Sequence, residues 1–263
     1  MSTYLKLVKL SFQRQITYRA ATLAGLATNY FFGLLRAAVL IALYGQRQQV
    51  AGITLQGAIT YTGISQATIA FLSLFSWYDV MRSVYTGEIG SDLLKPMDYF
   101  TFWMGRDLGR AFAQILLRGL PIMLGYALYF GITTPQSVSQ WLALLVVVLL
   151  AWLVSFSWRF LINLAAFWIP DAAGIGRLAF ALSWFLSGFL MPLRFFPEWF
   201  VRLCYLTPFP YTINTIVEVY LGLLKGADLW RAMLGQVVWI MVLVVAGRLV
   251  LQAGVRRLVI QGG

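Results

Sequence analysis

Apolar residues in this chain come in six long runs separated by short polar segments. Each run is close to the twenty or so residues that a helix needs to cross about 30 Å of hydrocarbon at roughly 1.5 Å per residue. The pattern predicts an all-α membrane protein with six transmembrane helices in a single domain over residues 1–263. The runs are 22–43, 55–78, 108–130, 140–163, 178–196 and 232–252.

A different pattern precedes the first run. Leu5, Val8, Phe12 and Ile16 recur at three- and four-residue spacing, and basic residues lie between them. On a helix the apolar positions share one face and most of the cations fall on the other. Residues 1–20 therefore predict an amphipathic helix lying in the membrane interface.

Lysines and arginines in the connecting segments indicate the orientation. With the N-terminus placed inside, the inner segments 1–21, 79–107, 164–177 and 253–263 hold ten cations, whereas the outer segments hold four. Because cytoplasmic loops carry an excess of Lys and Arg, we expect both termini to be cytoplasmic.

The segment that joins the last two runs is apolar, but four prolines interrupt it: Pro192, Pro197, Pro208 and Pro210. Proline removes a backbone donor and clashes with the preceding helical turn, so a continuous helix is excluded. Broken backbone at membrane depth is tolerated only against protein or a wet cavity. We expect short re-entrant helices over residues 192–222, with an ordinary interfacial loop as the alternative.

Composition and charge narrow the function further. The chain is 60% hydrophobic and 11% charged, and its net charge of +11 comes from cations that flank the apolar runs. These cations indicate anionic membrane lipid as a partner rather than nucleic acid. There is no histidine, no phosphate-binding GxxxxGK[ST] loop and no cluster of metal-ligating residues in the sequence, so we expect no catalytic residues, metal or cofactor in this chain.

The loop between the second and third runs holds the most distinctive sequence, YTGEIGSDLLKPMD at 85–98. Five of the nine acidic residues lie in or beside it, which favours contact with a soluble partner. Gly87 and Gly90 would allow a tight turn, Leu93 and Leu94 would give an apolar anchor, and a proline follows. The alternative is a solvated loop that only links two spans.

Three strings in this order resemble the permease subunits of ABC transporters of the ABC-2 type. They are GEIGSDLLKPMDYF, SGFLMPLRFFPEWF and LTPFPYT. The basic amphipathic N-terminal helix, the six spans and the proline-broken outer segment fit the same family. The chain is most similar to small bacterial exporter permeases without a fused ATPase, which implies a place in the bacterial inner membrane.

The resemblance also implies partners and a coupling site. Such permeases pair with a second permease, either a copy of the chain or a sister six-span protein, and bind two ATP-binding-cassette subunits that hold ATP and Mg. The loop over 79–107 would be the coupling loop. Its matching residues are Gly87, Glu88, Ile89, Gly90, Asp92, Leu93, Leu94, Lys95 and Pro96.

By the same resemblance, the first and fifth spans line a translocation path for a hydrophobic or amphipathic substrate, and the proline-broken segment closes its outer end. The path residues would be Phe31, Phe32, Arg36, Trp184 and Phe185. The outer gate would be formed by Pro192, Pro197, Trp199, Phe200, Pro208 and Pro210. An autonomous secondary transporter and a non-catalytic membrane assembly subunit are the alternative functions. A secondary transporter would show internal repeats and intramembrane acids, which the sequence does not favour.

Overall fold

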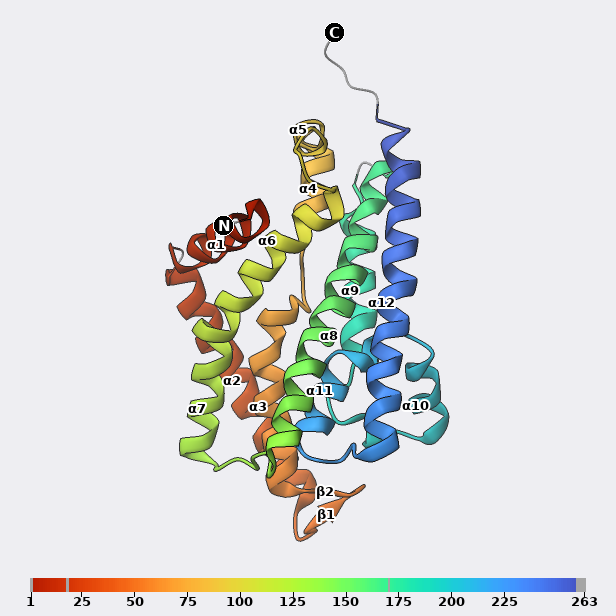
Figure 1. Cartoon of the computed structure of the whole chain (residues 1–263). Helices are drawn as coiled ribbons and strands as arrows, with labels where there is room; N and C mark the ends of the chain where they lie inside the picture. The colour runs from red at the N-terminus through yellow and green to blue at the C-terminus, as the bar shows by residue number, and fades with distance from the viewer. Residues whose placement is uncertain (1, 18, 170, 259–263) are drawn as a thin grey trace.

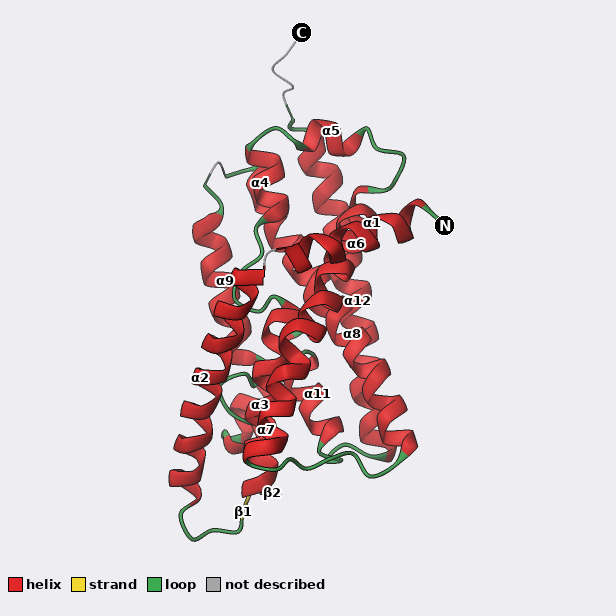
Figure 2. Cartoon of the chain, turned by 90° about the vertical axis from the view of Figure 1, so that its left-hand side faces the viewer, coloured by secondary structure: helices red, strands yellow, loops and turns green. Residues whose placement is uncertain are grey.

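The computed structural model describes residues 2–17, 19–169 and 171–258, and helices dominate it. Long helices run side by side between two ends of the molecule (Figure 1). The start of α1 and the end of α12 lie near the same end, and the loop between α2 and α3 lies at the opposite end (Figures 1 and 2). The helices are α1 (Thr3–Thr17), α2 (Arg19–Tyr44), α3 (Leu55–Leu72), α4 (Asp79–Tyr85), α5 (Ile89–Leu93), α6 (Tyr99–Gln114), α7 (Leu120–Tyr129), α8 (Val138–Asn163), α9 (Ala173–Leu186), α10 (Glu198–Tyr205), α11 (Ile213–Tyr220) and α12 (Gly226–Val255).

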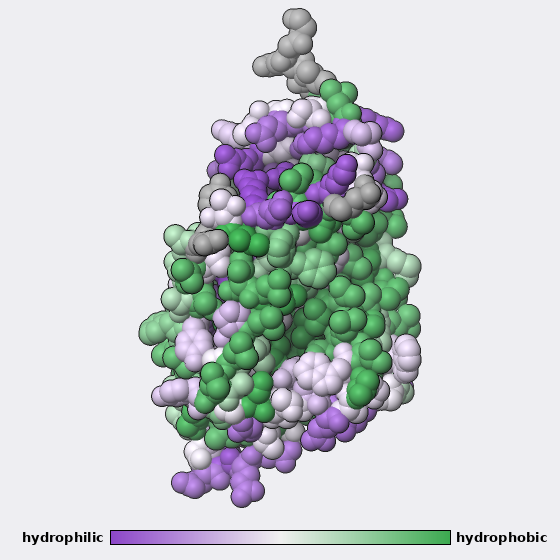
Figure 3. All heavy atoms as spheres, turned by 60° about the vertical axis from the view of Figure 1, so that its left-hand side comes forward, coloured by the Kyte–Doolittle hydropathy of each residue, from purple (hydrophilic) through white to green (hydrophobic). Residues whose placement is uncertain are grey.

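A broad belt of apolar side chains covers the middle of the molecule, and polar side chains gather at the two ends (Figure 3). In the described part of the chain, four helical segments are long and apolar enough to cross a membrane: Ala20–Tyr44, Tyr99–Tyr129, Val138–Phe167 and Gly226–Val255. They coincide with the first, third, fourth and sixth predicted spans. The all-α prediction is confirmed apart from a short antiparallel hairpin with two residues in each strand, β1 (Gln49–Val50) and β2 (Ile53–Thr54).

The second and fifth predicted spans are shorter than expected. Helix α3 ends at Leu72, because Ser73 adopts a left-handed conformation with φ of 49°, and residues 74–78 continue without helix. Helix α9 begins earlier than predicted and ends at Leu186, shortly before Gly188 with φ of +78°. The prediction of regular helix over 55–78 and 178–196 is therefore wrong at the C-terminal ends of both ranges. The residues there stay apolar although the backbone leaves the helix, so hydropathy alone does not show where the helix ends.

The third span begins nine residues before its predicted start. The Asp98 carboxylate accepts a hydrogen bond from the Thr101 backbone N–H at 3.0 Å and caps α6, which therefore starts inside the predicted loop. A π-helical turn, Ile115–Gly119, joins α6 to α7. Pro121 lies at the start of α7 and has no backbone N–H to continue the α-helical hydrogen bonds from α6. The wider π-helical turn before it accommodates the proline.

Helix α1, the predicted interfacial helix, packs across α6 near one end of the bundle (Figure 1). Gly105 and Gly109 on α6 allow the two backbones to approach closely, in a small-xxx-small arrangement. A β-carbon added at Gly109 would lie 2.2 Å from the Val8 carbonyl oxygen. The Ser11 hydroxyl donates a hydrogen bond to the Arg106 carbonyl at 2.5 Å and fixes the crossing.

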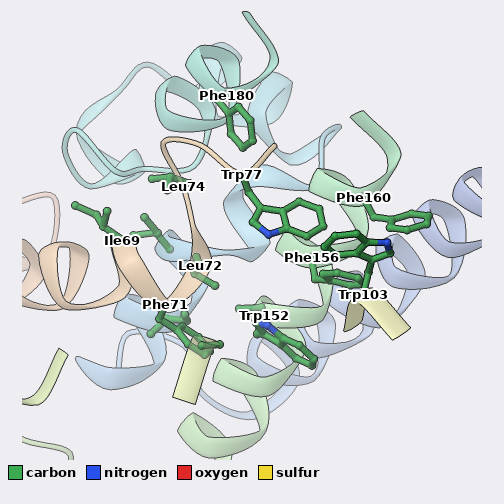
Figure 4. Close-up of a cluster of buried hydrophobic side chains, with 14 of the residues drawn as sticks. Ile69, Phe71, Leu72, Leu74, Trp77, Trp103, Trp152, Phe156, Phe160 and Phe180 are labelled. Carbon is green, nitrogen blue, oxygen red and sulfur yellow. The ribbon is translucent and has the colours of Figure 1, made fainter. Parts of the chain in front are cut away.

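An aromatic core lies where the residues after α3 meet α6 and α8 (Figure 4). The Trp77 ring packs edge-on against Trp103 and Phe156, with centroid separations of 5.9 and 5.8 Å. Edge-to-face pairs at these distances add to the stabilisation that comes from burial alone. The core therefore holds the connection between α3 and α4 rigidly against two of the long helices.

The proline-interrupted segment is folded rather than extended. It contains the short helices α10 and α11 and the 3₁₀ turns Leu193–Phe195 and Phe209–Tyr211. The predicted short helices are therefore present, and they lie at the end of the molecule opposite α5 (Figure 1).

Candidate functional site

The predicted coupling residues form a projecting helical hairpin made of α4 and α5 (Figure 1). Gly87 turns the chain between the two helices with φ of +77°, a conformation that favours glycine. Gly90 also takes part in the turn, because its N–H donates to the Gly87 carbonyl, but it lies within α5 and its backbone does not need glycine. Only Gly87 is therefore required by backbone geometry.

Two of the predicted coupling residues point into the hairpin and hold it together. The Asp92 carboxylate accepts a hydrogen bond from the Ser83 hydroxyl at 2.8 Å and pairs with Lys95. Ile89 is 2% exposed and belongs to the aromatic core. The Lys95 ammonium also lies 4.0 Å from the centre of the Phe102 ring on α6. These contacts stabilise the hairpin and leave its tip for other partners.

The tip carries exposed charged and apolar groups. Glu88 and Pro96 are exposed, Leu93 is 36% exposed and Leu94 is 87% exposed. Tyr85, which the sequence did not single out, is 76% exposed beside them. An exposed cluster of one carboxylate and three large apolar side chains on a polar end of the protein can bury area against a soluble partner.

A buried ion cluster lies beneath the hairpin and joins α6 to α8. The Asp107 carboxylate, on α6, binds both terminal nitrogens of Arg159 on α8 at 3.0 and 2.8 Å. It also accepts hydrogen bonds from Arg110 Nε and Trp152 Nε1, each at 2.8 Å. The side chain of Asp107 is fully buried and that of Arg159 is 1% exposed. Bidentate pairing and the additional donors compensate charges that would otherwise be costly to bury.

The same cluster holds the end of α3. Arg110 donates to the Ala70 and Phe71 carbonyl oxygens at 2.6 and 2.9 Å. The Ser155 hydroxyl on α8 donates to the Leu72 carbonyl at 2.7 Å. These carbonyls lie in the last turn of α3, where the helical ladder runs out of donors. The Ala70 carbonyl also accepts from the Ser73 N–H at 3.3 Å. Side chains of α6 and α8 thus supply hydrogen-bond donors to the carbonyls at the C-terminal end of α3, beyond which the helix does not continue.

Asn163 on α8 extends these contacts to the start of α4. Its amide nitrogen donates to the Trp77 carbonyl at 2.8 Å, and its amide oxygen accepts from the Met81 N–H at 3.0 Å. The projecting hairpin is therefore attached through hydrogen bonds and ion pairs to three long helices. Sequence reasoning missed this cluster, although the rule that an intramembrane arginine needs a partner could have led from Arg159 to Asp107.

The predicted path residues do not all converge. Phe31, Phe32 and Phe185 are 62%, 50% and 50% exposed on α2 and α9. Arg36 instead donates to the Phe189 carbonyl at 2.8 Å and lies 3.9 Å from that ring's centre. Trp184 packs against Phe75 with a centroid separation of 4.9 Å. Contacts of Arg36 and Trp184 with Phe189 and Phe75 thus link α2, the residues after α3 and the end of α9. Phe31 and Phe32 face outwards, and Phe185 packs against α10.

The predicted gate residues lie in and around α10. Phe200 packs against Phe185 of α9 at 5.7 Å, and Trp199 is 68% exposed. Glu198 and Arg202 pair on the exposed face at 3.1 Å. Of the four gate prolines, Pro197 is exposed. The other three are buried: Pro192, Pro208 and Pro210. The segment therefore contacts α9 on one side and presents an aromatic surface on the other.

Within the described ranges there is no group of three His, Cys, Asp or Glu side chains able to hold a metal ion. Among curated proteins, none matches this sequence. Residues 30–262 match the family model described as "ABC-2 family transporter protein". With nearly the whole chain covered by that match and four apolar helices of spanning length, the chain belongs to the ABC-2 family as a multi-pass membrane permease.

Proposed function

We propose that this chain is the membrane subunit of an ATP-driven exporter and that the α4–α5 hairpin docks a separate ATP-binding-cassette subunit. The observation that carries the proposal is the exposed tip of Glu88, Leu93 and Leu94 on a hairpin that is internally fixed by Asp92. A rigid projection with an exposed apolar and acidic surface is suited to receive force from a moving partner.

The path of that force follows from the attachments of the hairpin. Displacing α4 would pull on Asn163 and on the segment that carries Trp77, and so on α8 and the end of α3. The ion cluster would pass the displacement to α6, because Asp107 and Arg110 bind α8 and α3 together. Packed, hydrogen-bonded elements move as units rather than deforming continuously, so the long helices would tilt.

The assembled transporter would contain two such permeases, each crossing the membrane six times with its termini in the cytoplasm of a bacterial cell. In this arrangement the two shorter helices α3 and α9 would be the second and fifth spans, in addition to the four longer segments. The exposed aromatic faces of α2 and α9 would line the path between the permeases and favour a hydrophobic or amphipathic substrate. ATP and Mg would be bound by the two partner subunits, and α10 and α11 would close the outer end.

The coupling proposal can be tested by ATP hydrolysis in the purified complex. Glu88→Ala removes the exposed carboxylate, and Gly90→Pro removes the hydrogen bond from the Gly90 N–H to the Gly87 carbonyl at 3.1 Å. Both variants should lower hydrolysis several-fold while the permease still inserts. Gln48→Ala, in the loop at the opposite end, is the matched control. Unchanged hydrolysis in both hairpin variants would contradict the proposal.

A further inference from the structure

A small cavity of about 240 Å³ opens between the end of α3, the residues that follow it, and the π-helical turn after α6. Its lining is unusually polar for a place between membrane helices. Ser73, Ser76, Gln114, Arg110 and Arg118 all contribute to it, together with the Phe75 ring. Ser73 has a left-handed backbone and the adjoining turn is π-helical, and both irregularities are frequent at functional sites.

We propose that this cavity binds the phosphate of an amphipathic ligand, with Arg118 as its principal partner and Phe75 contacting the apolar part. The proposal deepens the proposed function, because the ligand would be the transported substrate class. It concerns binding to the permease and can be tested without the ATPase.

The charge balance around the cavity favours an anion. Arg110 and Arg159 both bind Asp107, the carboxylate of the neighbouring ion cluster. Within the described ranges no carboxylate lies within 4 Å of Arg118, and Arg110 lines the same cavity. A cation held between apolar helices without an anionic partner is costly, and a bound phosphate would remove that cost.

Unused hydrogen-bonding capacity points into the same region. Arg118 donates from one terminal nitrogen to the Ala21 carbonyl at 3.1 Å, but its buried Nε has no partner. Gln114 is 8% exposed, and its buried side-chain oxygen also lacks a partner. A phosphate in the cavity would accept from the second terminal nitrogen of Arg118, which makes no hydrogen bond to any described residue, and a small side-chain shift would bring Nε and the Gln114 oxygen into reach of the same head group. Charge-assisted bonds of this kind are the strong ones in a water-poor site.

The aromatic neighbours of the cavity favour an amphiphile over a free phosphate ion. Phe75 is 40% exposed, and its ring packs against Trp184 and Phe189 at 4.9 and 5.4 Å. Phe189 is 3% exposed beneath Arg36, so the accessible aromatic surface beside the cavity comes from Phe75 and the half-buried Trp184. A ligand whose phosphate contacts Arg118 could therefore lay its apolar chain along this surface and bury additional area.

Native mass spectrometry of the full chain, released from detergent micelles, tests the proposal with defined probes. Dioleoyl phosphatidic acid should bind saturably, and dioleoylglycerol, which lacks the phosphate, at least about tenfold more weakly. Inorganic phosphate in large excess should not displace the lipid. Equal binding of the two lipids, or displacement by inorganic phosphate alone, would overturn the assignment to a phosphate-bearing amphiphile.

Variants locate the binding to this cavity. Arg118→Gln should weaken phosphatidic acid binding about tenfold or more, whereas Arg248→Gln, an exposed arginine on α12, should change it less than about twofold. Ser76→Asp changes an exposed side chain and places a negative charge in the cavity, so it should also abolish binding even if Arg118→Gln folds poorly. Wild-type affinity in Ser76→Asp, or equal losses in Arg248→Gln, would overturn the proposal.

Discussion

Replacing Asp107 with asparagine should destabilise the permease more than any change in its exposed ion pairs. The substitution removes the charge that compensates Arg159, whose side chain is 1% exposed and whose two terminal nitrogens both bind this carboxylate. Breaking a buried pair by removing one partner costs about 3–5 kcal/mol, because the other charge stays buried without compensation. Arg110 loses a contact as well, so the upper part of this range is expected.

The assay is thermal unfolding of the purified protein in detergent, followed by loss of the monodisperse peak on size exclusion. A loss of 3–5 kcal/mol should lower the Tm by about 10 °C for a chain of this length. Arg202→Gln is the matched control, because the Glu198–Arg202 pair is 86% and 77% exposed, and it should cost less than about 1 kcal/mol. A double variant, Asp107→Leu with Arg159→Leu, should be more stable than Asp107→Asn. A Tm for Asp107→Asn within 2 °C of the wild type would refute the reasoning.

Three other predictions follow from the packing and the topology. Gly109→Ala should separate α1 from α6 and lower the Tm, because the added β-carbon would lie 2.2 Å from a carbonyl oxygen, and an unchanged Tm would contradict the close crossing. In a cysteine-free background, an impermeant thiol reagent added outside intact cells should label Gln48→Cys but not Ser91→Cys; the reverse result would overturn the proposed orientation. Replacing Trp199 and Phe200 together with alanine should lower the Tm less than Asp107→Asn does and make reconstituted vesicles leaky to ions, and tight vesicles would remove α10 from the gate.

Hydrophobic periodicity was sufficient to predict the helical membrane fold. The apolar runs predicted the four segments of spanning length, although the third begins nine residues before its predicted start, and the three- and four-residue spacing of Leu5, Val8 and Phe12 predicted α1. The prolines also predicted short helices in the segment before α12. These features depend on local composition and backbone chemistry, which a single sequence contains.

The ends of α3 and α9 and the ion cluster could not be predicted in the same way. The left-handed Ser73 interrupts a run that stays apolar, so hydropathy continues past the helix end. Asp107 and Arg159 are 52 residues apart, and their pairing depends on how α6 packs against α8. The sequence placed Asp107 in a loop because the capped start of α6 at Asp98 was not recognised. The outward direction of Phe31 and Phe32 likewise depends on tertiary packing.

The central claim, that the α4–α5 hairpin docks an ATP-binding-cassette subunit, is tested most directly by site-specific photo-crosslinking in cells. A benzophenone amino acid at Leu94, which is 87% exposed at the hairpin tip, should form a covalent adduct. Mass spectrometry should identify the captured chain by a GxxxxGK[ST] phosphate-binding motif. The same probe at Val138, which is 77% exposed at the opposite end, should capture no such chain. Absence of an ATPase adduct at Leu94, or equal capture at both positions, would contradict the account.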